Sequence, residues 1–524
     1  MIARHFLSDL NPHTLWPAAL TGAAKGLDAS HPIPDSVWAG CQRAALEVED
    51  IVKSGRIVYG INTGFGRFAE CAVDPVQLAE LQRNLVLSHA AGVGEETERE
   101  VVMAMWLLRL RTLLRGHSGV TVETIQRLMR ILQAGILGCV PVRGSVGASG
   151  DLAPGAHSAL AMMGIGPCTY LDEAGKVQRG DAGEVLGRAG LAAVVLGPKE
   201  GLAMINGTHY TTALAIKLWN QTCRLLRVAN LTSAISMEAT GGTGTVLEPT
   251  VLRTHHRETE RAGADIRHWL TNSTAHHDAR ESGRFAQAPY CLRCAPQVHG
   301  AVLRELRVAY DTLHGEMDAI GDNPLLFPEE GLVASCGNFH AIYPARVCDS
   351  LAAVLANLAV IAERRINMLM DTRLSGLPMF LVPDGGLNSG FMMAHVSAAA
   401  LASEAKIHAM PASVDSIPTN CDREDHVSMG PGAALKALRV ADLVQKVLAI
   451  ELMSGMQALE MRGGREIPLH LRSVRDTVRE QVPFLAKDAV LSPMIAACDA
   501  LLNDGPIIQE QEAAAFVTAP LPER

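Results

Sequence analysis

Hydrophobic residues recur at helical spacing along most of this chain of 524 residues. Leu78, Leu81 and Leu85 return every three or four positions, which predicts a helix that begins at Asp74 and Pro75. The same kind of pattern predicts further helices over 35–53, 95–115, 123–137 and 156–164, and five longer ones over 213–238, 296–318, 343–370, 388–410 and 434–461. Several of these five are apolar around nearly their whole circumference, which is typical of helices buried in a large bundle or a subunit interface.

Loops rich in glycine and small residues interrupt this pattern at 58–66, 144–154 and 201–208. The segment 169–198 is expected to be a surface excursion, and the His- and Arg-rich region 241–290 is expected to lie on the outside.

The pattern as a whole predicts a mainly α fold in two domains. Residues 1–210 are expected to form an irregular α/β N-terminal domain that carries the loops, and residues 211–524 a long central and C-terminal helical bundle. Aromatic residues make up only 4% of the chain, which also favours helix over sheet.

The charge and the cysteines restrict the function classes. The net charge is −9 with no basic block, so nucleic acid is not an expected partner. The longest apolar runs are too short to span a bilayer, and the start of the chain has no secretory pattern. Eleven cysteines in such a chain favour reduced thiols in a cytoplasm.

The candidate chemistry begins with the loop Gly144 to Pro154, which contains Ser149 between Ala148 and Gly150. It lacks the Lys and Ser/Thr of a phosphate loop, and Asp151 stands where a nucleophile elbow needs glycine. Two interpretations remain. The loop is a structural turn, or the Gly150 nitrogen attacks the Ala148 carbonyl, and loss of water leaves an electrophilic methylidene-imidazolone ring.

Other candidate groups are isolated, and each also has a structural explanation. Tyr59 carries the only titratable oxygen of its loop, His89 ends a helix, and Asn206 is the one strong hydrogen-bonding side chain of 201–208. Cys291 and Cys294 form a Cys-x-x-Cys pair that supports a zinc site only weakly and permits a redox role. The doublets His255–His256 and His276–His277 lie in polar stretches, and we expect no metal site there.

The order of the polar clusters along the chain is informative. They comprise Tyr-Gly-Ile-Asn-Thr-Gly-Phe-Gly at 59–66, Gly-Ala-Ser-Gly-Asp-Leu-Ala-Pro at 147–154, Asp-Gly-Gly-Leu-Asn-Ser-Gly-Phe at 384–391, and shorter clusters at 287–293, 321–324, 337–340 and 423–428. From about Tyr59 to Ser428 the chain resembles the aromatic amino-acid ammonia-lyase family, most closely its histidine ammonia-lyase branch.

The resemblance implies a fold, a prosthetic group and an assembly. It implies a mainly helical fold of the fumarase/aspartase-like superfamily and a homotetramer whose active sites draw on three subunits. The prosthetic group it implies is 4-methylidene-imidazole-5-one (MIO), formed from Ala148, Ser149 and Gly150 without an external cofactor.

The resemblance also implies roles for individual residues. Tyr59 is the base that removes the β-proton, Arg293 binds the substrate carboxylate, and Tyr290 lies beside the ring and the amine. Asn206, Gln287 and Phe339 match family positions that contact or flank the site. Ser88–His89 is the pair typical of the histidine branch, and Glu424 matches a carboxylate thought to address the imidazole. The base requires a lowered pKa, and Arg293 suits bidentate pairing.

Four positions depart from the histidine-branch pattern: His209, Ala295, Ile342 and Arg423. Arg423 stands beside Glu424, where a cation is expected to pair with that carboxylate or to favour a more acidic substrate group. The sequence therefore predicts a lyase that forms trans-urocanate and ammonia from L-histidine. It leaves open a lyase or 2,3-aminomutase for a modified histidine or another aromatic amino acid, an inactive helical scaffold, and a Cys-x-x-Cys redox protein.

Overall fold

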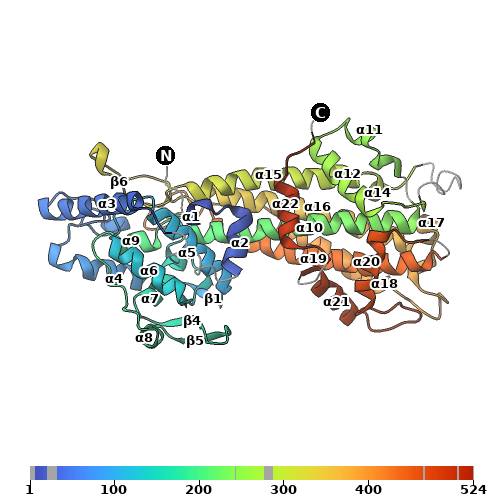
Figure 1. Cartoon of the computed structure of the whole chain (residues 1–524), viewed down its shortest axis with the longest axis horizontal. Coiled ribbons are helices and arrows are strands. Elements are labelled where there is room, and N and C mark those ends of the chain that lie inside the picture. Colours follow the sequence, from blue (N-terminus) through green and yellow to red (C-terminus); the bar gives the residue numbers. More distant parts are fainter. Residues whose placement is uncertain are drawn as a thin grey trace. The chain divides into compact units, whose positions relative to one another are not determined.

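The computed structural model describes residues 6–20, 32–241, 244–275, 287–463, 466–503 and 507–522 (Figure 1). Helices dominate this part of the chain and the strands are few and short, so the predicted mainly α fold is confirmed. The His276–His277 doublet lies outside the described residues.

The chain packs as two compact units, each assembled from separate stretches of sequence. The first unit comprises Met1–Lys217, Asp311–Cys348 and Pro411–Leu435, and the second comprises Leu218–Tyr310, Asp349–Met410 and Lys436–Arg524. The first unit thus takes in three stretches that the sequence placed with the helical bundle, residues 211–217, 311–348 and 411–435. The division into domains at residue 210 stays a prediction.

The helices of the first unit mostly follow the predicted pattern. They are α1 (Phe6–Asp9), α2 (Pro12–Leu20), α3 (Asp35–Ser54), α4 (Leu78–His89), α5 (Arg99–Leu113), α6 (Val122–Gln133), α7 (Leu152–Met162), α8 (Ala182–Arg188) and α9 (Glu200–Ile205). Helix α5 is buried from Val101 to Leu113, whereas α6 is strongly amphipathic. The helix predicted from Pro75 opens with a short 3-10 turn, in which the Asp74 side chain accepts a hydrogen bond from the Val76 N–H.

Three small antiparallel sheets complete this unit. Strand β1 (Val93–Glu96) pairs with β3 (Pro141–Arg143), β4 (Pro167–Leu171) lies between β2 (Leu137–Gly138) and β5 (Val177–Asp181), and β6 (Leu325–Phe327) pairs with β7 (Leu332–Ala334). The helix predicted over 95–115 is therefore too long at both ends, by four residues at its start and two at its end, and the helix predicted over 123–137 is too long at its end. Helix α6 ends before Gly135, whose φ of 67° requires a left-handed backbone and breaks the helix.

The second unit is built from long helices and short connecting ones. Its own helices are α11 (Pro249–Leu252), α12 (Arg257–Trp269), α14 (Tyr290–Arg293), α17 (Thr372–Ser375), α18 (Met392–His408), α20 (Leu469–Arg479), α21 (Ser492–Asn503) and α22 (Glu510–Thr518). Helix α18 begins four residues later than predicted, because Gly390 has a φ of 53°.

Four long helices contribute residues to both units. They are α10 (His209–Thr240), α15 (Ala295–Asp318), α16 (Ile342–Met370) and α19 (Gly430–Met461). Helix α16 is long and apolar enough to cross a membrane, but 61% of its most apolar stretch is buried inside the protein. Core helices can be equally long and apolar, so α16 gives only weak support for a membrane span.

Candidate active site

The glycine-rich loop between β3 and α7 is held by backbone contacts that only glycine permits. The Asp151 N–H donates to the Gly207 carbonyl at 2.8 Å, and the Gly207 N–H donates to the Ser149 carbonyl at 3.3 Å. Gly150 has a φ of 76°, and a Cβ atom there would lie 2.2 Å from the Gly207 oxygen. The middle of the Ala148–Ser149–Gly150 segment is therefore pressed against a second chain segment.

The same loop lies at the start of three helices. Helix α7 begins directly after Asp151, whose carboxylate accepts two 2.8 Å hydrogen bonds from the Thr211 N–H and hydroxyl in the first turn of α10. Just before α19, the Met429 N–H donates to the Val146 carbonyl at 2.8 Å. Helix N-termini carry partial positive charge, so this arrangement favours negative charge at the loop.

Asp151 adds a buried carboxyl group to this loop. Its burial raises the pKa to about 6, although hydrogen bonds from Thr211 and the nearby Arg109 guanidinium oppose the shift. Arg109 is itself buried and donates to the carbonyls of Ala203 and Asn206 at 2.6 Å. Asp151 belongs to the glycine-rich motif, but no sequence pattern showed that its carboxyl group is buried. Arg109 is a lone charged residue inside a helical stretch, with no distinguishing spacing.

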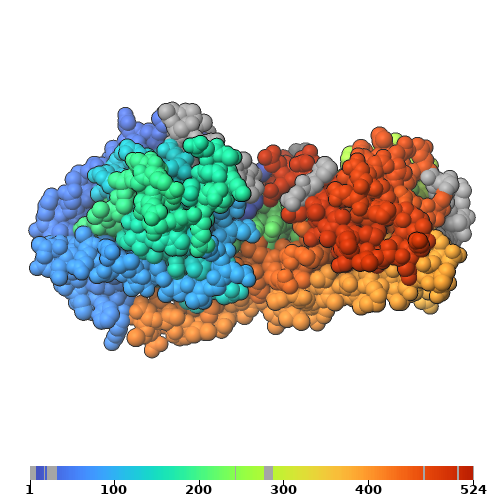
Figure 2. Space-filling view, turned by 90° about the horizontal axis from the view of Figure 1, so that it is seen from below, coloured from blue at the N-terminus to red at the C-terminus, as the bar shows by residue number. Residues whose placement is uncertain are grey.

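Ser149 and Glu424 meet although 275 residues separate them. The Ser149 hydroxyl donates to Glu424 Oε1 at 3.0 Å, and the Thr419 hydroxyl donates to Glu424 Oε2 at 2.5 Å. Thr419 and Glu424 close a tight turn through backbone hydrogen bonds of 3.1 and 3.4 Å. Figure 2 shows the orange residues that include this turn lying against the blue N-terminal part of the chain.

A cavity of about 590 Å³ opens beside Glu424. It is lined by Gly64, Phe65, Gly66, Phe68, Leu81, Asn84, Leu85, Ser88, His89, Leu152, Asn420 and Glu424. Ser88, His89 and Glu424, which the sequence selected as specificity residues, thus line one cavity. Asn420 lines it as well and was missed. The sequence did carry a signal for a turn here, because Asn and Asp, as in Asn-Cys-Asp, tolerate a left-handed backbone. The structure has that backbone, with φ between 50° and 64° over 420–422.

His89 ends α4 with its ring orientation determined by the backbone. Nδ1 lies 2.8 Å from the Leu85 carbonyl, which can only accept, so the proton is on Nδ1 and Nε2 is the acceptor in the neutral ring. Burial lowers the pKa of His89, and the Leu85 carbonyl and the Glu424 charge oppose this shift. The Ser88 hydroxyl also donates to the Leu85 carbonyl, at 3.1 Å.

Tyr59 lies in the loop that lines the other side of this cavity, with its ring edge-on to Phe65 at 6.5 Å. Burial raises the pKa of its phenol, and the Glu424 carboxylate raises it further. A hydrogen bond from the Gly66 backbone N–H acts in the opposite direction. The expectation of a lowered pKa is therefore wrong for the chain taken alone, because desolvation outweighs the one favourable contact.

Asn206 and Phe339 belong to the same unit. The Asn206 side-chain NH₂ donates to Asp322 Oδ1 and to the Asn323 carbonyl, both at 3.3 Å. Asp322 in turn pairs with Lys199 at 2.7 Å, and both side chains are almost fully buried. Phe339 is partly buried two residues before Ala341, whose N–H reaches the Gly147 carbonyl at 3.5 Å.

Gln287, Tyr290 and Arg293 belong to the second unit. Gln287 and Tyr290 are exposed, and the Arg293 guanidinium lies 4.7 Å from the centre of the Tyr290 ring. Cys291 and Cys294 line a cavity of about 490 Å³ beside them. Burial raises the pKa of the Cys291 thiol, which is the opposite of what a reactive dithiol requires, so the redox hypothesis loses its support.

The four departures from the family pattern lie in different surroundings. His209 is buried, its Nε2 lies 3.0 Å from the Thr112 hydroxyl, and burial lowers its pKa well below the usual value. Ala295 and Ile342 are the first residues of α15 and α16. Arg423 pairs with the exposed Glu70 at 3.7 Å. The expected pairing of Arg423 with Glu424 is wrong, because the turn directs the two neighbouring side chains to different partners.

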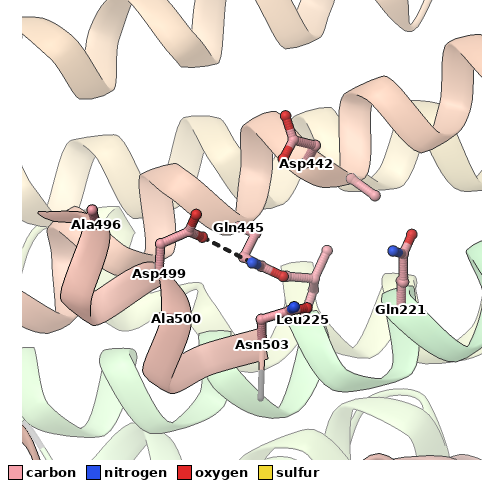
Figure 3. Close-up of a pocket in the computed structure, with 9 residues that line it drawn as sticks. Gln221, Leu225, Asp442, Gln445, Ala496, Asp499, Ala500 and Asn503 are labelled. Carbon is pink, nitrogen blue, oxygen red and sulfur yellow. Dashed lines mark hydrogen bonds between the residues drawn. The ribbon is translucent and has the colours of Figure 1, made fainter. Parts of the chain in front are cut away.

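A third cavity, of about 430 Å³, lies in the second unit between α10, α19 and α21 (Figure 3). Its polar groups mostly satisfy one another, as when Gln445 donates to Asp499 at 2.8 Å and Arg224 donates to Gln445 and Asn503. Asp442 pairs with Lys446 and Arg439. Among the described residues, no group of three His, Cys, Asp or Glu side chains could hold a metal ion.

Comparison with known proteins places this site in a class. Residues 15–480 match the family described as aromatic amino acid lyase, and the chain belongs to that family of carbon–nitrogen lyases. It is 42% identical to the histidine ammonia-lyase of Vibrio cholerae over 471 residues, which cover 90% of this chain and 91% of the relative.

Solved structures show the same likeness. Histidine ammonia-lyase from Trypanosoma cruzi matches with a TM-score of 0.84 and 36% identity, over 98% of this chain and 97% of that one. Tyrosine aminomutase from Streptomyces globisporus matches with a TM-score of 0.88 and 31% identity, over 98% of each chain.

Family membership implies a prosthetic group of the MIO type, and the residues present fit it. Gly150 has no side chain to block its nitrogen, and a Cβ at Gly147 would lie 2.2 Å from the Ser428 hydroxyl oxygen. The Ala148 side chain is buried, and Ser149 is partly buried with its hydroxyl hydrogen-bonded to Glu424.

Proposed function

We propose that this protein is an ammonia-lyase that converts L-histidine to trans-urocanate and ammonia. The observation that carries the proposal is the hydrogen bond from Ser149 to Glu424, in a cavity that His89 also lines. It brings the residue that would form the electrophile next to two groups suited to an imidazole. The sequence identity to histidine ammonia-lyases supports the same activity.

Ala148, Ser149 and Gly150 are proposed to cyclise into the MIO group. When formed, this group supplies an electrophile that captures the substrate amine and makes nitrogen easier to expel. The protein's part is to compress the loop through Gly207 and to place three helix N-termini beside it.

The imidazole of the substrate is proposed to lie between Glu424 and His89. A neutral imidazole offers one donor and one acceptor nitrogen. Glu424 accepts from the donor. His89 donates to the acceptor in its protonated form, which burial disfavours and the nearby Glu424 charge favours. The family resemblance assigns Arg293 to the carboxylate, Tyr290 to the amine, and Asn206, Gln287 and Phe339 to the rest of a site that is shared between subunits.

Tyr59 is proposed to remove the β-proton. The groups that the chain places around Tyr59 raise its pKa overall. The positive charge that would lower this pKa is therefore proposed to come from the substrate ammonium, the surroundings of the prosthetic group or another subunit.

We propose a homotetramer in the cytoplasm with sites shared between subunits. Support comes from α18, where Met393, Val396 and Ile407 are each about half exposed or more, as is Met410 just beyond it. Apolar side chains gathered in this way are typical of a protein interface. None of the eleven cysteines, all of which lie in the described part of the chain, forms a disulfide, which fits a reducing compartment.

The first test is to incubate the purified protein with L-histidine and follow urocanate and ammonia, with Ser149→Ala as the control. The expected result is turnover in the parent and none in the control, with a mass loss of two waters in the parent alone. Turnover in Ser149→Ala would overturn the proposed electrophile. An intact ring without turnover would mean that the substrate is another amino acid. A β-amino acid product would indicate an aminomutase, which is the second candidate because of the likeness to tyrosine aminomutase.

A further inference from the structure

The turn Thr419–Glu424 contacts both sides of the candidate site. At one end Glu424 accepts the hydrogen bond from Ser149. Near the other end, directly after Thr419, the Asn420 side chain lies over the glycine loop that follows Tyr59. Asn420 Oδ1 accepts a hydrogen bond from the Arg67 N–H at 3.2 Å. The turn is closed by its own backbone hydrogen bonds, so these two side chains are held at a set separation.

The fit between Asn420 and the glycine loop is close. A Cβ atom at Gly66 would lie 2.2 Å from Asn420 Nδ2 and 2.5 Å from Oδ1, so a side chain at Gly66 would displace the carboxamide. Gly66 and Asn420 both have a positive φ, of 56° and 52°. The backbone of each is thus shaped for this contact.

Gly66 connects the contact to Tyr59. Its neighbour Phe65 packs edge-on against the Tyr59 ring, and the Gly66 backbone N–H acts to lower the pKa of the Tyr59 phenol. Movement of Gly66 therefore changes the surroundings of the reactive oxygen even though Asn420 does not touch that oxygen.

We infer that Asn420 is a positioning residue, which holds the loop around Gly66 and Arg67 and so keeps Phe65 and the Gly66 backbone in place beside the Tyr59 ring. The effect on catalysis rests on the proposed role of Tyr59 as base. The effect on the loop does not, since it follows from the contact with Gly66 and Arg67 alone.

The contact predicts a direction for the pH profile. The charged and titratable groups on the segments around Tyr59 include Cys421, Asp422, Arg423 and Glu424 of the turn, His89 of α4, and Arg67, Glu70 and Cys71 after its own loop. The Gly66 N–H stabilises the phenolate, so its loss raises the pKa of Tyr59. A base acts when deprotonated, and the acidic limb of kcat/KM therefore moves to higher pH.

The test compares Asn420→Gly with the parent. Glycine keeps the left-handed backbone without strain and removes only the side chain. We expect amide exchange of the peptide covering 64–68 to become about three to ten times faster, kcat/KM at neutral pH to fall by a similar factor, and the acidic limb to rise by about half a unit.

Two further variants separate the acceptor from other effects. Asn420→Asp keeps an oxygen at the same place and should keep the parent's exchange rate; its added charge acts on Tyr59, so only exchange is compared. Asn272→Gly makes the same change at another exposed asparagine with a left-handed backbone, φ 67°, and should leave both readouts unchanged.

Parent-like exchange and pH profile in Asn420→Gly would overturn the inference, and so would exchange in Asn420→Asp as fast as in Asn420→Gly. If the parent itself does not turn over L-histidine, the proposed function fails, and the exchange rates alone still decide whether Asn420 holds the loop.

Discussion

The loop 144–151 and the turn Thr419–Glu424 meet at one hydrogen bond, between Ser149 and Glu424, but the protein holds them in different ways. Contacts with Gly207, Thr211 and Met429 fix the loop from three sides, and a buried carboxylate, Asp151, lies at its end. The turn is mostly exposed. It contacts the Tyr59 side of the site through Asn420, which meets Gly66 and Arg67, and through Arg423, which pairs with Glu70.

This difference separates two requirements. Ring formation requires a strained backbone geometry, which only a densely packed surrounding can impose. Substrate recognition requires side chains that reach into a cavity, and an exposed turn can change its sequence without loss of the fold. The departure at Arg423 lies in the turn, whereas Gly147 to Pro154 keeps the family motif throughout.

The largest expected effect comes from breaking the rigid side with Gly150→Ala. The new Cβ would overlap the Gly207 carbonyl, so the loop cannot keep its present shape. We expect no ring and no detectable turnover. Intact-protein mass, which reports the loss of two waters, and urocanate formation measure the two outcomes.

Gly166→Ala is the matched control. Gly166 has the same φ of 76°, but a Cβ there has nothing within 4 Å. Gly166→Ala should be destabilised only by the cost of a left-handed alanine, about 1–2 kcal/mol, and should keep the ring. Equal loss of the ring in both variants would show that left-handed strain, and not the contact with Gly207, governs cyclisation.

A smaller effect is expected from Tyr59→Phe. This variant tests whether the side of the site that the exposed turn contacts contributes to the chemistry. Phenylalanine keeps the edge-on contact with Phe65 and loses only the hydroxyl. If Tyr59 is the base, kcat should fall by about 10² to 10⁴ while the ring still forms. Steady-state kinetics and intact mass on the same preparation measure both, and near-normal kcat would remove Tyr59 from this role.

The fold could be predicted from the sequence wherever helical periodicity was long and uninterrupted. Helix α3 was predicted to within one residue at its end, and α16 to within one at its start. The errors fell at helix ends such as Gln133 and Met392, where a glycine with positive φ or a strand pairing decides the boundary. Those interactions are tertiary and leave no periodic signal.

The site could be predicted only through motifs, and only in part. The sequence selected Ser149, Glu424 and His89, and the structure brings them together in one unit. It could not supply the pKa of Tyr59, because burial and the distant Glu424 determine it. It also missed Asn420, whose importance arises from a contact across 353 residues with Arg67.

The smallest expected effect comes from Arg423→Gln, which restores the neutral amide that the histidine branch carries at this position. Arg423 pairs with Glu70 at 3.7 Å, and both side chains are about half exposed or more, so the pair contributes about 0–1 kcal/mol. We therefore expect kcat/KM on L-histidine to change less than about twofold. Glu70→Gln removes the same pair from the other side and should behave alike. A large gain in Arg423→Gln alone would mean that the cation acts on Glu424 or the substrate after all, and that the exposed turn determines specificity through charge as well as through Asn420.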